Sequence, residues 1–101
     1  MLKNSHLCNL KKIHFVTFVP VYIGVAFDII ENRIYWTDVK KKVIMSSTMD
    51  GTLIKTWNST DIVKPEFLAI DHIGRNIYYS DSKTTSISAC KITDQVICKV
   101  S

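Results

Sequence analysis

Four shortages in the 101-residue chain exclude whole classes of protein. Its three cysteines do not form the two close pairs that hold a structural zinc ion, and their odd number leaves at least one unpaired. Its three histidines have no ligand spacing with the cysteines. No stretch keeps the period of an amphipathic helix over the roughly 10–15 residues that a helical repeat needs. The net charge of +4 is scattered along the chain, so a nucleic-acid partner is not indicated.

The sequence also lacks an apolar run long enough for a membrane span. A transmembrane helix needs about 20 apolar residues, whereas the longest run, residues 13–27, is shorter and is broken by Thr17, Pro20 and Gly24. Lysines precede this run as in a signal peptide, but no small-x-small cleavage site follows it. The end of the run also forms the first strand of a repeat. We therefore expect residues 1–21 to be a lead-in segment left from a preceding blade, with a signal peptide as the open alternative.

What the sequence does contain is a pattern that occurs twice. The segment Arg33-Ile34-Tyr35-Trp36-Thr37-Asp38 is followed 43 residues later by Asn76-Ile77-Tyr78-Tyr79-Ser80-Asp81. The same offset aligns residues 25–58 with the second half of the chain without a gap. A period in the low forties with short apolar runs is typical of a β-propeller blade or of a helical repeat. The lack of helical periodicity favours the blade.

Each copy contains four short strands separated by turn residues, which is the composition of one propeller blade. The pair Asp50-Gly51 marks the last hairpin of the first copy, and Asp94 stands in the corresponding turn of the second. The predicted fold class is therefore all-β, with two four-stranded antiparallel blades at residues 22–65 and 66–101. The predicted strands are residues 22–27, 33–37, 43–48, 53–57, 66–70, 76–80, 86–91 and 96–100.

Two blades do not close a ring, because a propeller normally has at least four. Each terminal blade would expose an apolar face and unpaired strand edges. We therefore expect the chain to be a fragment of a larger protein whose remaining blades are its first partners.

The acidic and aromatic residues of the repeat are predicted to be structural. Tyr35 and Trp36 point to opposite faces of one strand, so one packs between blades and the other within its own blade. The hydroxyl and the carboxylate that end the strand can bond to turn amides. Paired acids can indicate catalysis, but these recur at equivalent positions of different blades, so no catalytic residue and no metal site are predicted. The structural set is Asp28, Tyr35, Trp36, Thr37, Asp38, Asp71, Tyr78, Tyr79, Ser80 and Asp81.

The segment Tyr35-Trp36-Thr37-Asp38 resembles the signature of the low-density-lipoprotein receptor class B repeat, also called the YWTD repeat. Residues 23–28 and 68–77 resemble the first strand and turn of the same repeat, and within the family they are most similar to the nidogen propellers. The resemblance covers residues 23–100. Tyr79 and Ser80 depart from the signature, which has tryptophan and threonine there. The resemblance implies a six-bladed propeller of which this chain holds about two blades.

The same resemblance implies a non-catalytic, extracellular protein-binding module of the basement membrane, with a matrix protein such as laminin as its partner and no cofactor. The alternative is the ectodomain of an endocytic or signalling receptor related to the low-density-lipoprotein receptor. A six-bladed enzyme of the gluconolactonase type is a further alternative. It needs acidic and amide side chains that converge from several blades on a metal ion, whereas the acids here are better explained by turns. No partner-contacting residue is carried over from the family.

Two covalent modifications are also predicted. Asn58-Ser59-Thr60 is an acceptor triplet for an N-linked glycan on the exposed link between the blades. Cys90 and Cys98 flank the last hairpin symmetrically about Asp94, which places them opposite one another with Cα atoms about 4.5–5.5 Å apart, within reach of a disulfide. A bridge requires an oxidising compartment, and the alternative is two small buried hydrophobic residues. Cys8 is left over.

Overall fold

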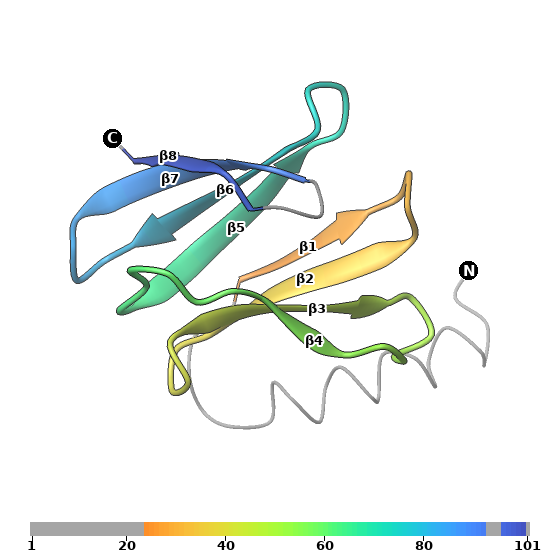
Figure 1. The fold of residues 1–101 in the computed structure, drawn as a ribbon, viewed down its shortest axis with the longest axis horizontal. Helices are drawn as coiled ribbons and strands as arrows, with labels where there is room; N and C mark the ends of the chain where they lie inside the picture. The colour runs from red at the N-terminus through yellow and green to blue at the C-terminus, as the bar shows by residue number, and fades with distance from the viewer. Residues whose placement is uncertain (1–23, 93–95, 101) are drawn as a thin grey trace.

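The computed structural model describes residues 24–92 and 96–100 of the chain. These residues form two four-stranded antiparallel sheets, in the order β1-β2-β3-β4 and β5-β6-β7-β8 (Figure 1). The predicted all-β fold with two four-stranded blades is confirmed. The predicted lead-in at residues 1–21, with Cys8, lies outside the described residues. The strands are β1 (Val25–Asp28), β2 (Arg33–Asp38), β3 (Val43–Thr48), β4 (Lys55–Asn58), β5 (Pro65–Asp71), β6 (Asn76–Asp81), β7 (Ser86–Lys91) and β8 (Cys98–Val100).

The two sheets repeat each other residue for residue in their first three strands. The four pairs that join β1 to β2 recur 43 residues later between β5 and β6, and the pairs of β2 with β3 recur between β6 and β7. The left-handed backbone positions recur as well, since Asn32 has φ 55° and its counterpart Arg75 has φ 58°. Such values are uncommon for residues other than glycine. The two copies therefore share their turn geometry as well as their strand pattern.

The outer strands begin two residues later than predicted, at Lys55 in β4 and at Cys98 in β8. In the first sheet the cause is a wide loop. The Thr48 hydroxyl and the Asp50 carboxylate bond to each other and to the Thr52 amide. Because these contacts hold residues 48–52 in a loop of their own, the Asp-Gly pair does not close a two-residue hairpin.

The core lies between the two sheets, where one face of the first sheet meets the opposite face of the second. Strand β5 contacts both β1 and β2. Both blades therefore contribute to one core, which is stabilised by the burial of apolar surface at roughly 25 cal/mol per Å². The buried members are Ala26, Tyr35, Ile44, Ile62, Leu68, Ile77, Tyr79, Cys90 and Ile92.

The alternation along β2 sends its two aromatic rings in opposite directions. Tyr35 enters the shared core, where its ring meets the Trp57 ring edge-on with centroids 5.6 Å apart. Trp36 lies on the other face of the first sheet, in a cluster with Ile34 and Met45. No helix in the described part of the chain is long and apolar enough to cross a membrane.

Candidate functional site

Most of the structural set lies at the junction of the blades and in the turns, whereas Trp36 lies on the other face of the first sheet and Tyr78 is exposed on the second. Thr37 is fully buried and joins three segments. Its hydroxyl accepts a hydrogen bond from the Gly24 amide at 2.8 Å and donates one to the Glu66 carbonyl of the second blade at 3.4 Å. The Thr37 amide donates to the Gly24 carbonyl at 2.9 Å. The threonine of the repeated signature therefore ties β2 to the start of β1 and to β5.

The close approach of β5 explains why a glycine precedes β1. A Cβ atom at Gly24 would stand 2.1 Å from the Glu66 carbonyl oxygen, a backbone atom that no side-chain rotation can move away. In the second copy Phe67 occupies the equivalent position and is 62% exposed. Its amide donates to the Ser80 hydroxyl at 3.0 Å, which repeats the bond between Gly24 and Thr37. The glycine is thus required only where a following blade approaches.

A buried ion pair links the blades at the other end of β1. Asp28 is fully buried and accepts hydrogen bonds from both terminal nitrogens of Arg75, at 2.9 and 2.7 Å. It also accepts one from the Ile30 amide. The Arg75 guanidinium holds the pKa of Asp28 below its ordinary value, against the opposing effect of burial and with help from turn amides. A bidentate arginine–carboxylate pair fixes direction as well as charge, so this pair sets the orientation of one blade against the other.

Sequence analysis missed Arg75. Its counterpart in the first copy is Asn32, so the repeat itself marks the position as variable. The sequence held one signal for the ion pair, which was the spacing. Arg75 lies in the turn of the following blade, one 43-residue repeat plus four residues after Asp28. A second contact lies beside this pair: the His72 Nε2 atom is 2.9 Å from the Phe27 carbonyl oxygen.

The other aspartates of the set organise turns. Burial opposes ionisation of Asp81, but backbone donors hold its pKa below the ordinary value. Asp38 and Asp71 accept hydrogen bonds from amides of the turns that follow them. Among the residues described, these carboxylates therefore serve backbone N–H groups and are not arranged as a pair for acid–base chemistry. The donors to Asp81 are the amides of Val63, Lys64, Lys83 and Thr84.

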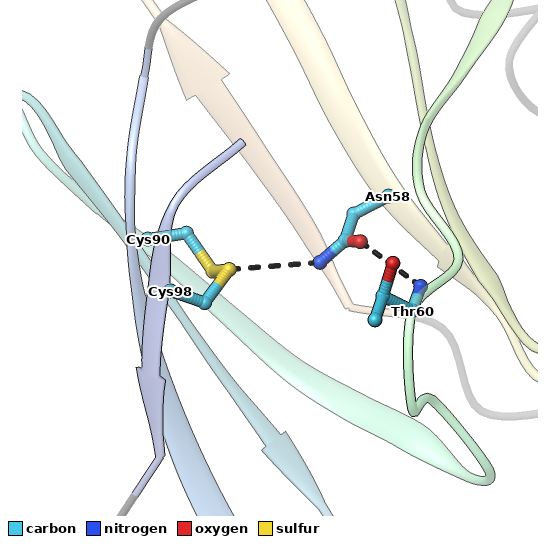
Figure 2. The surroundings of a disulfide bond; sticks show 4 residues. All are labelled: Asn58, Thr60, Cys90 and Cys98. Carbon is cyan, nitrogen blue, oxygen red and sulfur yellow. Dashed lines mark hydrogen bonds between the residues drawn. A yellow bond between two sulfur atoms is a disulfide. The ribbon is translucent and has the colours of Figure 1, made fainter. Parts of the chain in front are cut away.

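Cys90 and Cys98 lie opposite each other on β7 and β8 and are joined by a disulfide with an S–S distance of 2.05 Å (Figure 2). Their Cα atoms are 4.0 Å apart, closer than the expected range of about 4.5–5.5 Å. The next pair outward is hydrogen-bonded, because the Lys91 amide donates to the Ile97 carbonyl. The two cysteines therefore form a non-hydrogen-bonded pair, the closer of the two antiparallel arrangements.

Asn58 does not lie on the surface, contrary to the expectation of an exposed acceptor. It is the last residue of β4 and is only 6% exposed. Its Oδ1 atom accepts a hydrogen bond from the Thr60 amide at 3.0 Å, and its Nδ2 atom donates to the Cys98 sulfur at 3.7 Å (Figure 2). The prediction ended the strand at Trp57. In the structure β4 is one residue longer and ends at Asn58, whose side chain lies between the blades. Ser59 and Thr60 are exposed.

Residues 24–92 and 96–100 contain no group of three His, Cys, Asp or Glu that could hold a metal ion. A cavity of about 440 Å³ lies beside the inter-blade link and is lined by Asn58, Tyr79 and Asp81, among others. The Asp81 carboxylate already accepts hydrogen bonds from backbone amides. Backbone amides therefore hold the Asp81 carboxylate, which is not free to act as a base.

The second blade presents an apolar face that the first blade does not cover. We call this the outer face. It consists of Phe67, Tyr78, Ile87 and Ile97, which are between 36% and 62% exposed. The counterparts of Tyr78 and Ile87 in the first blade are Tyr35 and Ile44, and both are buried in the shared core. The repeat therefore marks the outer face as the surface on which a further blade would pack.

Comparison with known proteins agrees with this geometry. A sequence model of the family "Low-density lipoprotein receptor repeat class B" matches residues 32–72, which run from the turn before β2 through β5. This segment is a low-density lipoprotein receptor class B repeat. The signature of the class B repeat, residues 35–38, lies inside the matched segment.

The chain is also similar to nidogens. It is 35% identical over 86 residues to nidogen of Drosophila melanogaster, which covers 85% of this chain and 6% of that protein. It is 32% identical over 73 residues to nidogen-2 of Mus musculus, which covers 71% of this chain and 5% of that protein. The chain thus spans only a small part of these relatives.

A solved structure is similar as well. A chain of the crystal structure of a nidogen/laminin complex matches with a TM-score of 0.68 and 34% identity, over 77% of this chain and 30% of that chain. The resemblance to class B repeat propellers of the nidogen kind, predicted from the strand and turn phrases, is confirmed.

Proposed function

We propose that the chain is part of a non-catalytic, extracellular β-propeller that binds a matrix protein, with laminin as the partner. The observation that carries the proposal is the similarity, at 34% identity and a TM-score of 0.68, to a chain of a nidogen/laminin complex. Because this chain covers 30% of the matched chain, the binding surface is assigned to the complete propeller and not to named residues of the two blades.

The location is supported by the disulfide. Bridges of this kind form and persist in oxidising compartments and are rare in the cytosol, and Cys90 and Cys98 are paired across β7 and β8. The similarity to nidogens supports the finer assignment to the basement membrane.

A binding role, rather than an enzymatic one, is supported by how the acids are used. The carboxylates of Asp28 and Asp81 serve an inter-blade arginine and backbone amides, so neither is free to transfer a proton to a substrate.

We assign residues 22–65 and 66–101 to two successive blades and residues 1–21 to a lead-in.

Laminin binding by the complete gene product tests the proposal. The protein is passed over immobilised laminin in a surface plasmon resonance measurement, and saturable binding is expected. Heat-unfolded protein serves as the control, because the docking surface exists only on the folded propeller. A correctly folded protein that does not bind laminin contradicts the proposal. Cysteine-rich repeats and a membrane span elsewhere in the gene product would then favour the receptor alternative.

A further inference from the structure

The glycan acceptor triplet and the disulfide meet at one point between the blades. Figure 2 shows the Asn58 side chain reaching from β4 toward the bridged cysteines of β7 and β8. An N-linked glycan is attached to the asparagine Nδ2 atom. In Asn58 this atom donates a hydrogen bond to the Cys98 sulfur at 3.7 Å. Its Oδ1 atom is held by the Thr60 amide. Both the oxygen and the nitrogen of the Asn58 side-chain amide are therefore hydrogen-bonded in the folded chain.

We propose that the Cys90–Cys98 hairpin controls access to Asn58, so that the asparagine takes a glycan only in chains whose hairpin has not docked. The inference rests on the proposed extracellular location. In the transfer, the Asn58 nitrogen forms a bond to the anomeric carbon of a lipid-linked oligosaccharide pyrophosphate. The bond from that carbon to the pyrophosphate oxygen breaks, and the amide gives up one proton. The reaction requires Nδ2 to be exposed, whereas Asn58 is 6% exposed here.

Steric reasons make the glycan and the native contact exclusive. A distance of 3.7 Å between Nδ2 and the Cys98 sulfur is a contact distance and leaves no room for a sugar ring between them. Turning the side chain outward would break its bonds to the Thr60 amide and to the Cys98 sulfur. Conversely, a glycan already attached would keep β8 from closing against the end of β4. Asn58 therefore links the two blades by a hydrogen bond after folding and can accept a glycan only before folding.

Glycopeptide mass spectrometry of the full chain, produced behind a cleavable secretion signal, tests the inference. In the wild type we expect Asn58 without a glycan and Cys90 bridged to Cys98. In the Cys90→Ser/Cys98→Ser variant we expect a several-fold higher occupancy of Asn58. Secreted and retained fractions are both measured, because the variant is less stable. Wild-type chain synthesised in cells treated with a thiol reductant gives the same comparison without a substitution.

Two matched variants complete the design. Thr60→Ala in the bridge-free background removes the acceptor triplet while keeping the backbone amide, and its glycan is expected to disappear. Ser82→Asn creates the triplet Asn-Lys-Thr in the exposed turn between β6 and β7, and its occupancy is expected to be high in a bridged chain.

Three results would overturn the inference. They are an Asn58 glycan on molecules whose Cys90–Cys98 bridge is intact, an unoccupied Asn58 in both bridge-free chains, and an unoccupied acceptor in the Ser82→Asn variant. The last would show that exposure does not govern acceptor use in this protein. Because the secretion signal is supplied, none of these results depends on laminin binding, so a failure here is distinguishable from failure of the proposed function.

Discussion

At the scale of the residue, the four positions of the repeated signature have four separate tasks. Tyr35 packs against the following blade, and Trp36 packs on the opposite face. Thr37 bonds to two backbone segments, and Asp38 accepts a hydrogen bond from the Lys41 amide of the next turn. In the second copy Ser80 keeps the hydroxyl that receives the strand amide. The substitution of serine for threonine is therefore tolerated because the hydrogen bond, and not the methyl group, is what the position requires.

Thr37→Val tests this assignment. Valine has nearly the same shape but can neither accept the Gly24 amide nor donate to the Glu66 carbonyl. Leaving buried backbone groups without partners costs about 1–3 kcal/mol, so the free energy of unfolding in urea should fall by that amount. Thr37→Ser should lose much less.

The matched control is Thr56→Val, which changes an exposed threonine on β4 and should alter stability by no more than about 0.5 kcal/mol. Equal losses for the Thr37 and Thr56 variants would contradict the assigned role.

At the scale of the element, the turn between β1 and β2 and the turn between β5 and β6 are joined by charge. Asp28 ends β1, and Arg75 stands in the second turn at φ 58°. The Arg75 guanidinium reaches from this turn to the Asp28 carboxylate of the preceding blade. The strands on either side of these turns could be predicted from the repeat, but this contact could not, because the first copy has Asn32 at the arginine position.

Acid should weaken this joint. The pKa values of Asp28 and Asp81 are held below their ordinary values in the folded chain, whereas the unfolded chain has an aspartate pKa of about 3.9. A lowered folded pKa gives stability that is complete above the unfolded pKa and is lost as the pH falls through the folded pKa. The free energy of unfolding should therefore be nearly flat above about pH 5 and fall steeply below about pH 4.

Urea unfolding at a series of pH values checks this expectation. Asp28→Asn should be less stable at neutral pH and should show a shallower loss in acid, since one of the two linked groups is gone. Asp61→Asn removes an exposed charge from the link and serves as the control. An acid limb of unchanged slope in the Asp28 variant would argue against the ion pair as its source.

At the scale of the whole molecule, the two blades show how a further blade would attach. The first blade buries Tyr35 and Ile44 under the second, whereas the second leaves Tyr78 and Ile87 on its outer face. The prediction that a terminal blade exposes an apolar face therefore holds for the second blade. Exposed apolar faces of this kind promote association.

The isolated chain should self-associate through the outer face. Phe67→Lys places a charge on that face and should reduce the apparent mass in size-exclusion chromatography with light scattering. Leu53→Lys also replaces an exposed apolar residue, but in the loop between β3 and β4, and should leave association unchanged. Identical behaviour of the two variants would show that the outer face is not the contact.

The sequence by itself determined the first three strands of each blade and the faces of the repeated signature: alternating side chains, turn residues and a 43-residue offset specify them, because they depend on contacts between residues near in the chain. Only the tertiary structure decided how the blades meet. The pairing of Arg75 with Asp28, the need for Gly24 beside Glu66 and the burial of Asn58 against Cys98 all join positions far apart in the chain. Their physical basis is the close approach of two surfaces, which no periodicity within one blade records.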